Sequence, residues 1–141
     1  MTIAMFVGTG REIISVSAQT SVSEAVRLLA EKRIGAMPVV EGETVHGIIS
    51  ERDILYALAR DGAAILDWPV ERVMTAPAIT ITGTRGLLDA LALMTKRRVR
   101  HLPVVEEGRL VGFVSIGDLV KARMDRIEAE AAALRDYIQQ A

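Results

Sequence analysis

The feature that most constrains this chain is an internal repeat. Two runs return 65 residues later: MPVVE at 37–41 as LPVVE at 102–106, and GIISERD at 47–53 as GFVSIGD at 112–118. This register holds without a gap over residues 14–57 and 79–122. About a dozen of roughly 46 paired positions are identical, and most others keep their apolar or polar character. The chain is therefore predicted to contain two copies of one structural unit.

Each copy has the pattern of a β-α-β-β-α unit. Ile14 and Val16 alternate with serines, which is typical of a short strand. Thr20 or Ser21 can cap the helix that follows, and Glu24 lies three residues after Ser21, as in a capping box. The helical faces are predicted to be Val22, Ala25, Val26 and Leu29 in copy one, and Leu87, Ala90, Leu91 and Met94 in copy two. Two strands joined by a turn come next, and a second helix follows Ser50 or Ser115.

We expect an α+β fold of two βαββα repeats. A unit this small leaves one face of its sheet apolar, so the copies are predicted to pack sheet to sheet around a shared core, as one module with pseudo-twofold symmetry. The predicted segments are an N-terminal segment at 1–10, the first repeat at 11–62, a connector at 63–77, the second repeat at 78–124 and a C-terminal helix extension at 125–141.

The connector and the C-terminal end carry further helical patterns. A short helical turn is expected over residues 70–74, after Trp68 and Pro69. Residues 119–140 favour one long helix with an apolar stripe of Ile127, Ala131, Leu134 and Ile138. Because no third unit is present to cover this stripe, it is predicted to be a surface for a protein partner.

Composition excludes several classes of function. A net charge of -1 with 25% charged residues argues against a protein dedicated to nucleic acid or membrane surfaces. The absence of cysteine excludes thiolate catalysis, and two histidines argue against a metal centre. Residues 1–7 are apolar but too short for a signal peptide or a membrane span, so a cytoplasmic location is expected. No catalytic constellation stands out, so the chain is predicted not to be an enzyme and to have no catalytic residues.

Two units of this order resemble a tandem pair of cystathionine β-synthase (CBS) domains. The resemblance rests on the repeated GIISERD and GFVSIGD runs, the run RVRHLPV at 98–104, and Val-Met-Thr at 73–75. It implies a stand-alone regulatory module that binds adenosine-containing ligands (AMP, ADP, ATP, NAD or S-adenosylmethionine) in two clefts between the repeats. It also implies a homodimer and a signal passed to another protein.

Ser50 with Asp53, and Ser115 with Asp118, lie where a strand gives way to a helix. One interpretation is structural, because a serine and an acidic residue three positions later form a capping box. The other is functional, because a carboxylate can accept two hydrogen bonds from a ribose diol, and a helix N-terminus offers N–H groups to phosphate or ribose oxygens. The resemblance favours the second, and we assign both aspartates to ribose.

A basic run at 96–101 distinguishes the second copy. Cations at a helix end explain Lys96 and its neighbours. They explain Arg100 and His101 less well, because these residues immediately precede a strand that should be buried. Their counterparts in copy one are Gly35 and Ala36, which would leave room for the base or backbone of a ligand. We expect Arg100 and His101 to contact phosphates, with bidentate bonds from the arginine.

The remaining candidate ligand contacts differ between the copies. Ile34 and Val99 are predicted to form an apolar slot for a purine, although core packing also explains them. Arg52 could reach phosphate, whereas its equivalent, Gly117, would leave the other cleft more open. The last two candidates are Thr20, which also suits a helix cap, and Thr80 on the first strand of copy two.

These observations lead to one main hypothesis. The chain is predicted to sense an adenine nucleotide through two clefts of unequal charge. The alternative is a ligand-free scaffold for dimerisation or protein interaction. DNA binding is not favoured, since a single short basic cluster lacks a helix-turn-helix pattern to present it.

Overall fold

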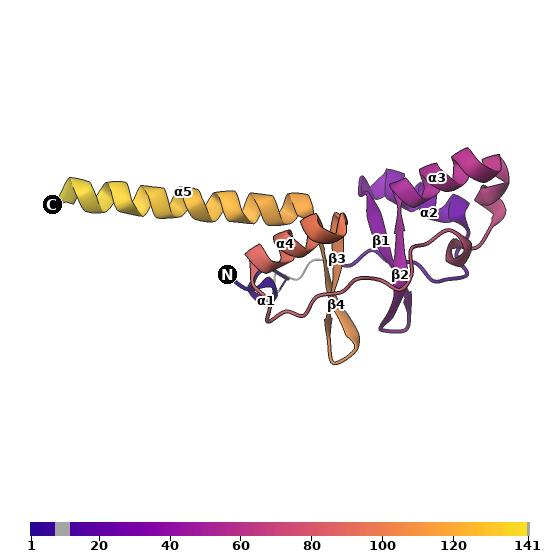
Figure 1. Cartoon of the computed structure of the whole chain (residues 1–141), viewed down its shortest axis with the longest axis horizontal. Coiled ribbons are helices and arrows are strands. Elements are labelled where there is room, and N and C mark those ends of the chain that lie inside the picture. The colour runs from indigo at the N-terminus through magenta and orange to yellow at the C-terminus, as the bar shows by residue number, and fades with distance from the viewer. Residues whose placement is uncertain (8–11, 141) are drawn as a thin grey trace.

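The computed structural model describes residues 1–7 and 12–140. Two similar units lie side by side, and one long helix projects from the second (Figure 1). The first unit comprises α2 (Val22–Lys32), β1 (Ala36–Glu41), β2 (Thr44–Ser50) and α3 (Glu51–Asp61), and the second comprises α4 (Leu87–Arg97), β3 (His101–Glu106), β4 (Arg109–Ser115) and α5 (Ile116–Gln140). The predicted α+β fold with two repeats and a C-terminal helix is confirmed.

The two hairpins have the same register. Strand β1 pairs with β2 and β3 pairs with β4, both antiparallel, and each ladder shifts its register after the fourth residue pair. The first strand of each predicted unit is reduced to one parallel bridge, between Val16 and Val39 in the first repeat and between Ile81 and Val104 in the second. Strand alternation over so few residues therefore predicts the position of the bridge but overstates its length.

The predicted cap of α2 is only half present. Ser21 is the N-cap, and its side chain accepts a hydrogen bond of 3.1 Å from the Glu24 N–H. The prediction that Glu24 completes a capping box is wrong, because its carboxylate pairs with Arg27 one turn further along. Arg27 also bonds Glu31, so this exposed triad draws the Glu24 side chain away from the cap.

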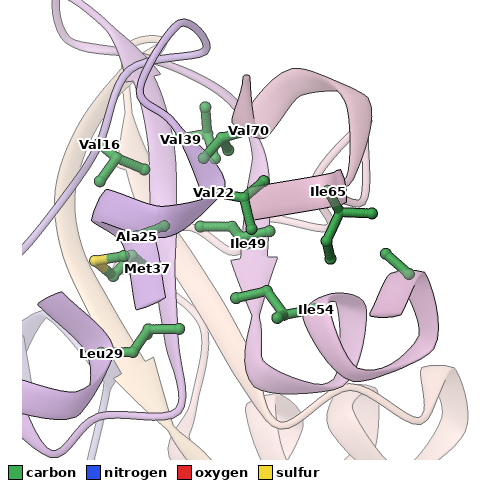
Figure 2. Close-up of a cluster of buried hydrophobic side chains, with 11 residues drawn as sticks. Val16, Val22, Ala25, Leu29, Met37, Val39, Ile49, Ile54, Ile65 and Val70 are labelled. Carbon is green, nitrogen blue, oxygen red and sulfur yellow. The ribbon is translucent and has the colours of Figure 1, made fainter. Parts of the chain in front are cut away.

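Each repeat has its own hydrophobic core. The predicted helical faces are largely confirmed, since α2 buries Val22, Ala25 and Leu29 and α4 buries Leu87, Ala90 and Met94. Figure 2 shows the first cluster, in which the α2 face meets the two strands of the hairpin and residues of the connector. The buried residues of the second repeat form a separate cluster. The prediction of one shared core is therefore wrong, although the hairpins touch through a hydrogen bond of 2.8 Å from Leu110 N–H to the Glu43 carbonyl.

The short helix α1 (Ile3–Val7) extends the repeat beyond what the sequence pattern indicates. It packs on the second repeat, just as the connector packs on the first with its 3₁₀ turns Gly62–Asp67 and Val70–Arg72. Equivalent backbone bonds join them: Val70 N–H to Thr20 O matches Ile3 N–H to Arg85 O, and Val22 N–H to Trp68 O matches Leu87 N–H to Met1 O. The segment before each repeat thus packs against the opposite repeat.

Two equivalent glycines make this exchange possible. A Cβ on Gly47 would lie 2.6 Å from the carbonyl oxygen of Thr75, and a Cβ on Gly112 would collide with the side chain of Val7. Both glycines are buried in the second strand of their hairpin. Their missing side chains let the exchanged segments lie directly on the strands.

Ile3 tests whether the exchanged segment holds the second core together. It is fully buried, whereas Met5 on the same helix is 67% exposed. Removing most of a buried isoleucine side chain leaves a cavity, so Ile3→Ala should lower the free energy of unfolding by about 2–5 kcal/mol. Met5→Ala is the matched control and should change it by about 0.5 kcal/mol or less. Urea unfolding measures both. If Ile3→Ala changed the free energy of unfolding as little as Met5→Ala is expected to, α1 would not contribute to the core.

Candidate ligand-binding clefts

Both strand-to-helix junctions carry the capping box expected from the sequence. At the first junction, Ser50 Oγ accepts a bond of 3.2 Å from Asp53 N–H, and Asp53 Oδ2 accepts one of 3.0 Å from Ser50 N–H. At the second, the equivalent bonds between Ser115 and Asp118 are 3.1 and 3.2 Å. The structural interpretation of these pairs is therefore correct. It leaves the ribose assignment open, because a carboxylate has about four lone-pair sites.

The first junction has an additional contact. Thr75 Oγ1, in the connector, donates a bond of 2.8 Å to Asp53 Oδ1. The same threonine pairs its backbone with Ile48 in both directions, at 2.9 Å. The connector therefore fixes the orientation of the Asp53 carboxylate as well as closing one side of the cavity beside it.

This cavity, which we call the Asp53 cleft, has a volume of about 240 Å³ and is lined by both repeats. The first repeat supplies the Ser50–Asp53 junction, and the second supplies Arg98, Val99, Arg100 and His101. Arg52 lines the same cavity, so the two charge differences noted between the copies meet in one place. Among the described lining residues, three arginines share this cavity with two carboxylates, Glu51 and Asp53.

The equivalent cavity, the Asp118 cleft, has a volume of about 410 Å³. Ser115 and Asp118 of the second repeat face Ile34, Gly35 and Ala36 of the first. Among the described residues that line it, the charged ones are Arg33 and two carboxylates, Glu12 and Asp118. The two clefts are thus related by the repeat, but their described lining residues have opposite charge balances.

Gly35 and His101 line both clefts and form the wall between them. A Cβ on Gly35 would lie 3.5 Å from His101 Cε1. The imidazole stacks on the ring of Phe113 with a centroid distance of 5.6 Å. Burial lowers the pKa of His101, and the opposing attraction of Asp118 and Glu51 does not restore it. The ring is therefore mainly neutral at pH 7 and offers a phosphate a single N–H rather than a full positive charge.

Three predicted contacts do not line either cleft. Thr20 lies in a turn, where its hydroxyl accepts a bond of 3.1 Å from Ser17 N–H. Thr80 is exposed beside the bridge of the second repeat, and Gly117 lies on the exposed side of the first turn of α5. The other predicted site residues line one cleft or both: Ile34, Gly35, Ala36, Ser50, Arg52, Asp53, Val99, Arg100, His101, Ser115 and Asp118.

Sequence reasoning missed several lining residues. Phe6 and Val7 reach the Asp118 cleft because α1 packs on the second repeat. Thr75 enters the Asp53 cleft for the equivalent reason. The Val-Met-Thr run at 73–75, which contributes to the resemblance to CBS domains, points to Thr75. The contact of Thr75 with Asp53 depends on tertiary packing and has no sequence pattern of its own.

Metal sites and membrane spans are absent from the described residues. Over residues 1–7 and 12–140, no cluster of three His, Cys, Asp or Glu side chains is placed to hold a metal ion. Within the same part of the chain, no helix has the length and apolar character needed to cross a membrane.

Comparison with known proteins identifies the family. The CBS domain family model matches the chain twice, at residues 9–60 and 70–125. The chain therefore belongs to the CBS-domain proteins. YhcV of Bacillus subtilis, a CBS domain-containing protein, is 34% identical over 124 residues, which are 86% of each chain. The mitochondrial CBSX3 of Arabidopsis thaliana is 36% identical over 124 residues, which are 84% of this chain. The match spans only 60% of the length of CBSX3.

Solved structures agree with this assignment. A CBS-domain containing protein from Agrobacterium tumefaciens has a TM-score of 0.81 and 37% identity, covering 86% of this chain and 92% of that one. CBSX2, solved in complex with AMP, has a TM-score of 0.75 and 29% identity, covering 88% and 96%. An inosine-5'-monophosphate dehydrogenase of Korarchaeum cryptofilum is 34% identical, but the match spans only 22% of that enzyme.

The lowered pKa of His101 predicts a pH-dependent stability. The native state binds fewer protons than the unfolded chain, whose imidazole has the ordinary pKa of 6.5. The free energy of unfolding should therefore fall as the pH drops below about 6.5 and recover above it. His101→Gln should flatten this dependence between pH 5 and 7, and thermal melts measure it. Both proteins retain His46, so identical pH profiles would contradict the assignment to His101.

Proposed function

We propose that this chain is a stand-alone regulatory module that binds an adenine nucleotide (AMP, ADP, ATP or NAD) and passes the signal to another protein. The observation that carries the proposal is the Asp53 cleft, where a fixed carboxylate shares one cavity with Arg52 of its own repeat and with Arg98 and Arg100 of the other repeat. A ligand that bridges these groups needs a polar diol near one end and negative charge near the other. A nucleotide has both.

The carboxylate of Asp53 suits the ribose. Its Oδ2 already accepts two bonds from Ser50, and its Oδ1 accepts one from Thr75. A ribose hydroxyl can use the remaining lone-pair capacity, or can replace the Thr75 hydroxyl on Oδ1. The cap thus positions the acceptor before the ligand arrives, which lowers the entropic cost of binding.

The arginines suit the phosphate. Arg52, Arg98 and Arg100 converge on the cavity from α3 and from the segment before β3. Guanidinium groups bind phosphate oxygens through paired, charge-assisted hydrogen bonds. The first N–H groups of α3 add a favourable dipole at the same edge, although the Glu51 N–H is bonded to Gly35 O at 2.9 Å.

Apolar side chains supply a place for the base. Ile48, Ile79 and Val99 line the Asp53 cleft from three different segments. Ile34 occupies the position of Val99 in the Asp118 cleft. A similar CBS-domain protein supports the choice of an adenine nucleotide, since CBSX2 was solved with AMP.

The two clefts should differ in preference. Like charges repel, so the two carboxylates of the Asp118 cleft disfavour a phosphate, and Arg33 is the one arginine among the described residues of its lining. The Asp53 cleft should therefore hold the more highly charged ligand. The Asp118 cleft is better suited to an adenosine compound with little negative charge.

A ligand-free scaffold remains the second candidate. The capping boxes at Asp53 and Asp118 support it, because they give both aspartates a structural role without a ligand. We further propose a cytoplasmic homodimer without catalytic activity of its own, the output of which passes to a protein partner. If the chain is a ligand-free scaffold, replacing either aspartate by alanine would change the free energy of unfolding. Adding any of the nucleotides would not change it.

Nucleotide binding should raise thermal stability. A ligand that binds only the native state stabilises it by about 2.7 kcal/mol at a hundred times its Kd. Millimolar AMP, ADP, ATP and NAD should therefore each be tested by thermal melts, with ribose 5-phosphate and inorganic phosphate as controls for the fragments. No shift with any nucleotide would contradict the proposal and favour the scaffold.

Arg100 tests the phosphate contact and identifies the cleft. Arg100→Gln should weaken AMP binding about tenfold or more, since a bond between charged groups contributes about 1.5–3 kcal/mol, and should change adenosine binding little. Arg33→Gln removes an arginine from the lining of the other cleft and should leave AMP binding intact. Titration calorimetry measures both. Loss of AMP binding in Arg33→Gln alone would place the phosphate in the Asp118 cleft instead.

A further inference from the structure

The C-terminal helix α5 carries a continuous apolar stripe that the described residues of this chain leave uncovered. Val120, Met124, Ile127, Leu134 and Ile138 are each between 42% and 62% exposed, and Ala131 completes the series. The buried residue of α5 is Leu119, in the first turn of the helix, which packs on the second repeat. The C-terminal end of the helix projects beyond both repeats (Figure 1).

The spacing of the stripe is that of a coiled coil. The six residues follow one another at intervals of four, three, four, three and four. This is a heptad repeat in which Met124, Ala131 and Ile138 occupy the a positions and Val120, Ile127 and Leu134 the d positions. A helix that only covered a core would show a wider face with a period of 3.6 residues. The apolar face therefore fits another helix rather than a flat surface.

The charges beside the stripe favour a parallel copy of the same helix. In a parallel pair, each g residue faces the e residue five positions further along the partner helix. Arg123 would then face Glu128 of the second copy, and Glu130 would face Arg135. Both contacts join opposite charges, and symmetry provides each of them twice.

An antiparallel pair lacks this complementarity. Full overlap of the stripes would place Val120 against Ile138, and the flanking contacts between two charged residues would then be Glu128 with Glu128, Glu130 with Glu130, and Lys121 with Arg135. All three join like charges. Within one chain Glu130 bonds Arg126 at 3.2 Å, but both side chains are exposed, so this pair can exchange partners on association.

We propose that α5 pairs in parallel with α5 of a second copy of this chain, forming a two-stranded coiled coil over residues 120–138. The apolar stripe of one copy is thus covered by the same stripe of a second copy. The clefts of the two copies are then related by the twofold symmetry of the pair. This assembly does not depend on what the clefts bind.

Disulfide trapping tests the orientation, because the natural chain has no cysteine. In a parallel pair, the two copies of residue 138 lie side by side, so Ile138→Cys in the full chain should form a covalent dimer under mild oxidation. In the antiparallel pair they would be about 27 Å apart, given a rise of 1.5 Å per residue over 18 residues. Asp136→Cys, on the outer face of the pair, is the matched control and should remain largely uncrosslinked.

Charge reversal tests the pairing itself. Glu130→Arg and Arg135→Glu should each weaken self-association by at least tenfold, since each places like charges at two symmetric contacts. Mixing the two variants should restore a dimer, because both contacts then join opposite charges. Light scattering measures the mass, expected to be twice the 15.3 kDa of the chain for the unaltered protein.

Ile127→Asp with Leu134→Asp should give a folded monomer. Circular dichroism and the thermal melt verify that both repeats remain folded, and AMP titration of this monomer tests the clefts separately. A monomeric unaltered protein, a dimer that survives this double substitution, or a dimer that the Ile138→Cys substitution fails to crosslink would overturn the proposal.

Discussion

The reciprocal packing of the leading segments is the constraint on which the rest of the structure depends. Ile3 fills the core of the second repeat and Val70 fills that of the first, so neither core is complete without residues that precede the other repeat. Each core is small and poor in aromatic residues. The exchange increases the apolar area buried in both and fixes how the repeats face each other. The clefts exist because of that fixed relation, since each is walled by both repeats.

The same exchange connects folding to the chemistry of the site. The connector can lie directly on Gly47 because glycine has no side chain to collide with the Thr75 carbonyl. This contact also brings the Thr75 hydroxyl to Asp53, where it holds the carboxylate already used by the cap. Stability and the proposed ligand recognition thus share the same residues. For this reason, substitutions at Asp53 need a stability measurement beside every binding measurement.

Much of the fold and of the candidate site could be predicted from the sequence, for identifiable reasons. The 65-residue register placed both hairpins and both capping boxes, because these depend on short-range patterns that the two copies share. It also predicted Arg52 and Arg100, but not that they line the same cleft, since this follows from how the repeats face each other. The role of α1 was missed because its correspondence with residues 68–74 is offset by 67 residues, not 65, and preserves only apolar character. The shared core was predicted wrongly because the exchanged segments already cover each apolar face.

The wall formed by Gly35 and His101 has a geometric consequence. Each of these two residues belongs to the lining of both cavities. The imidazole stacks on Phe113, and a methyl group added at Gly35 would lie 3.5 Å from its Cε1. A substitution at either position therefore alters the walls of both clefts at once, so its effects on the two cannot be separated.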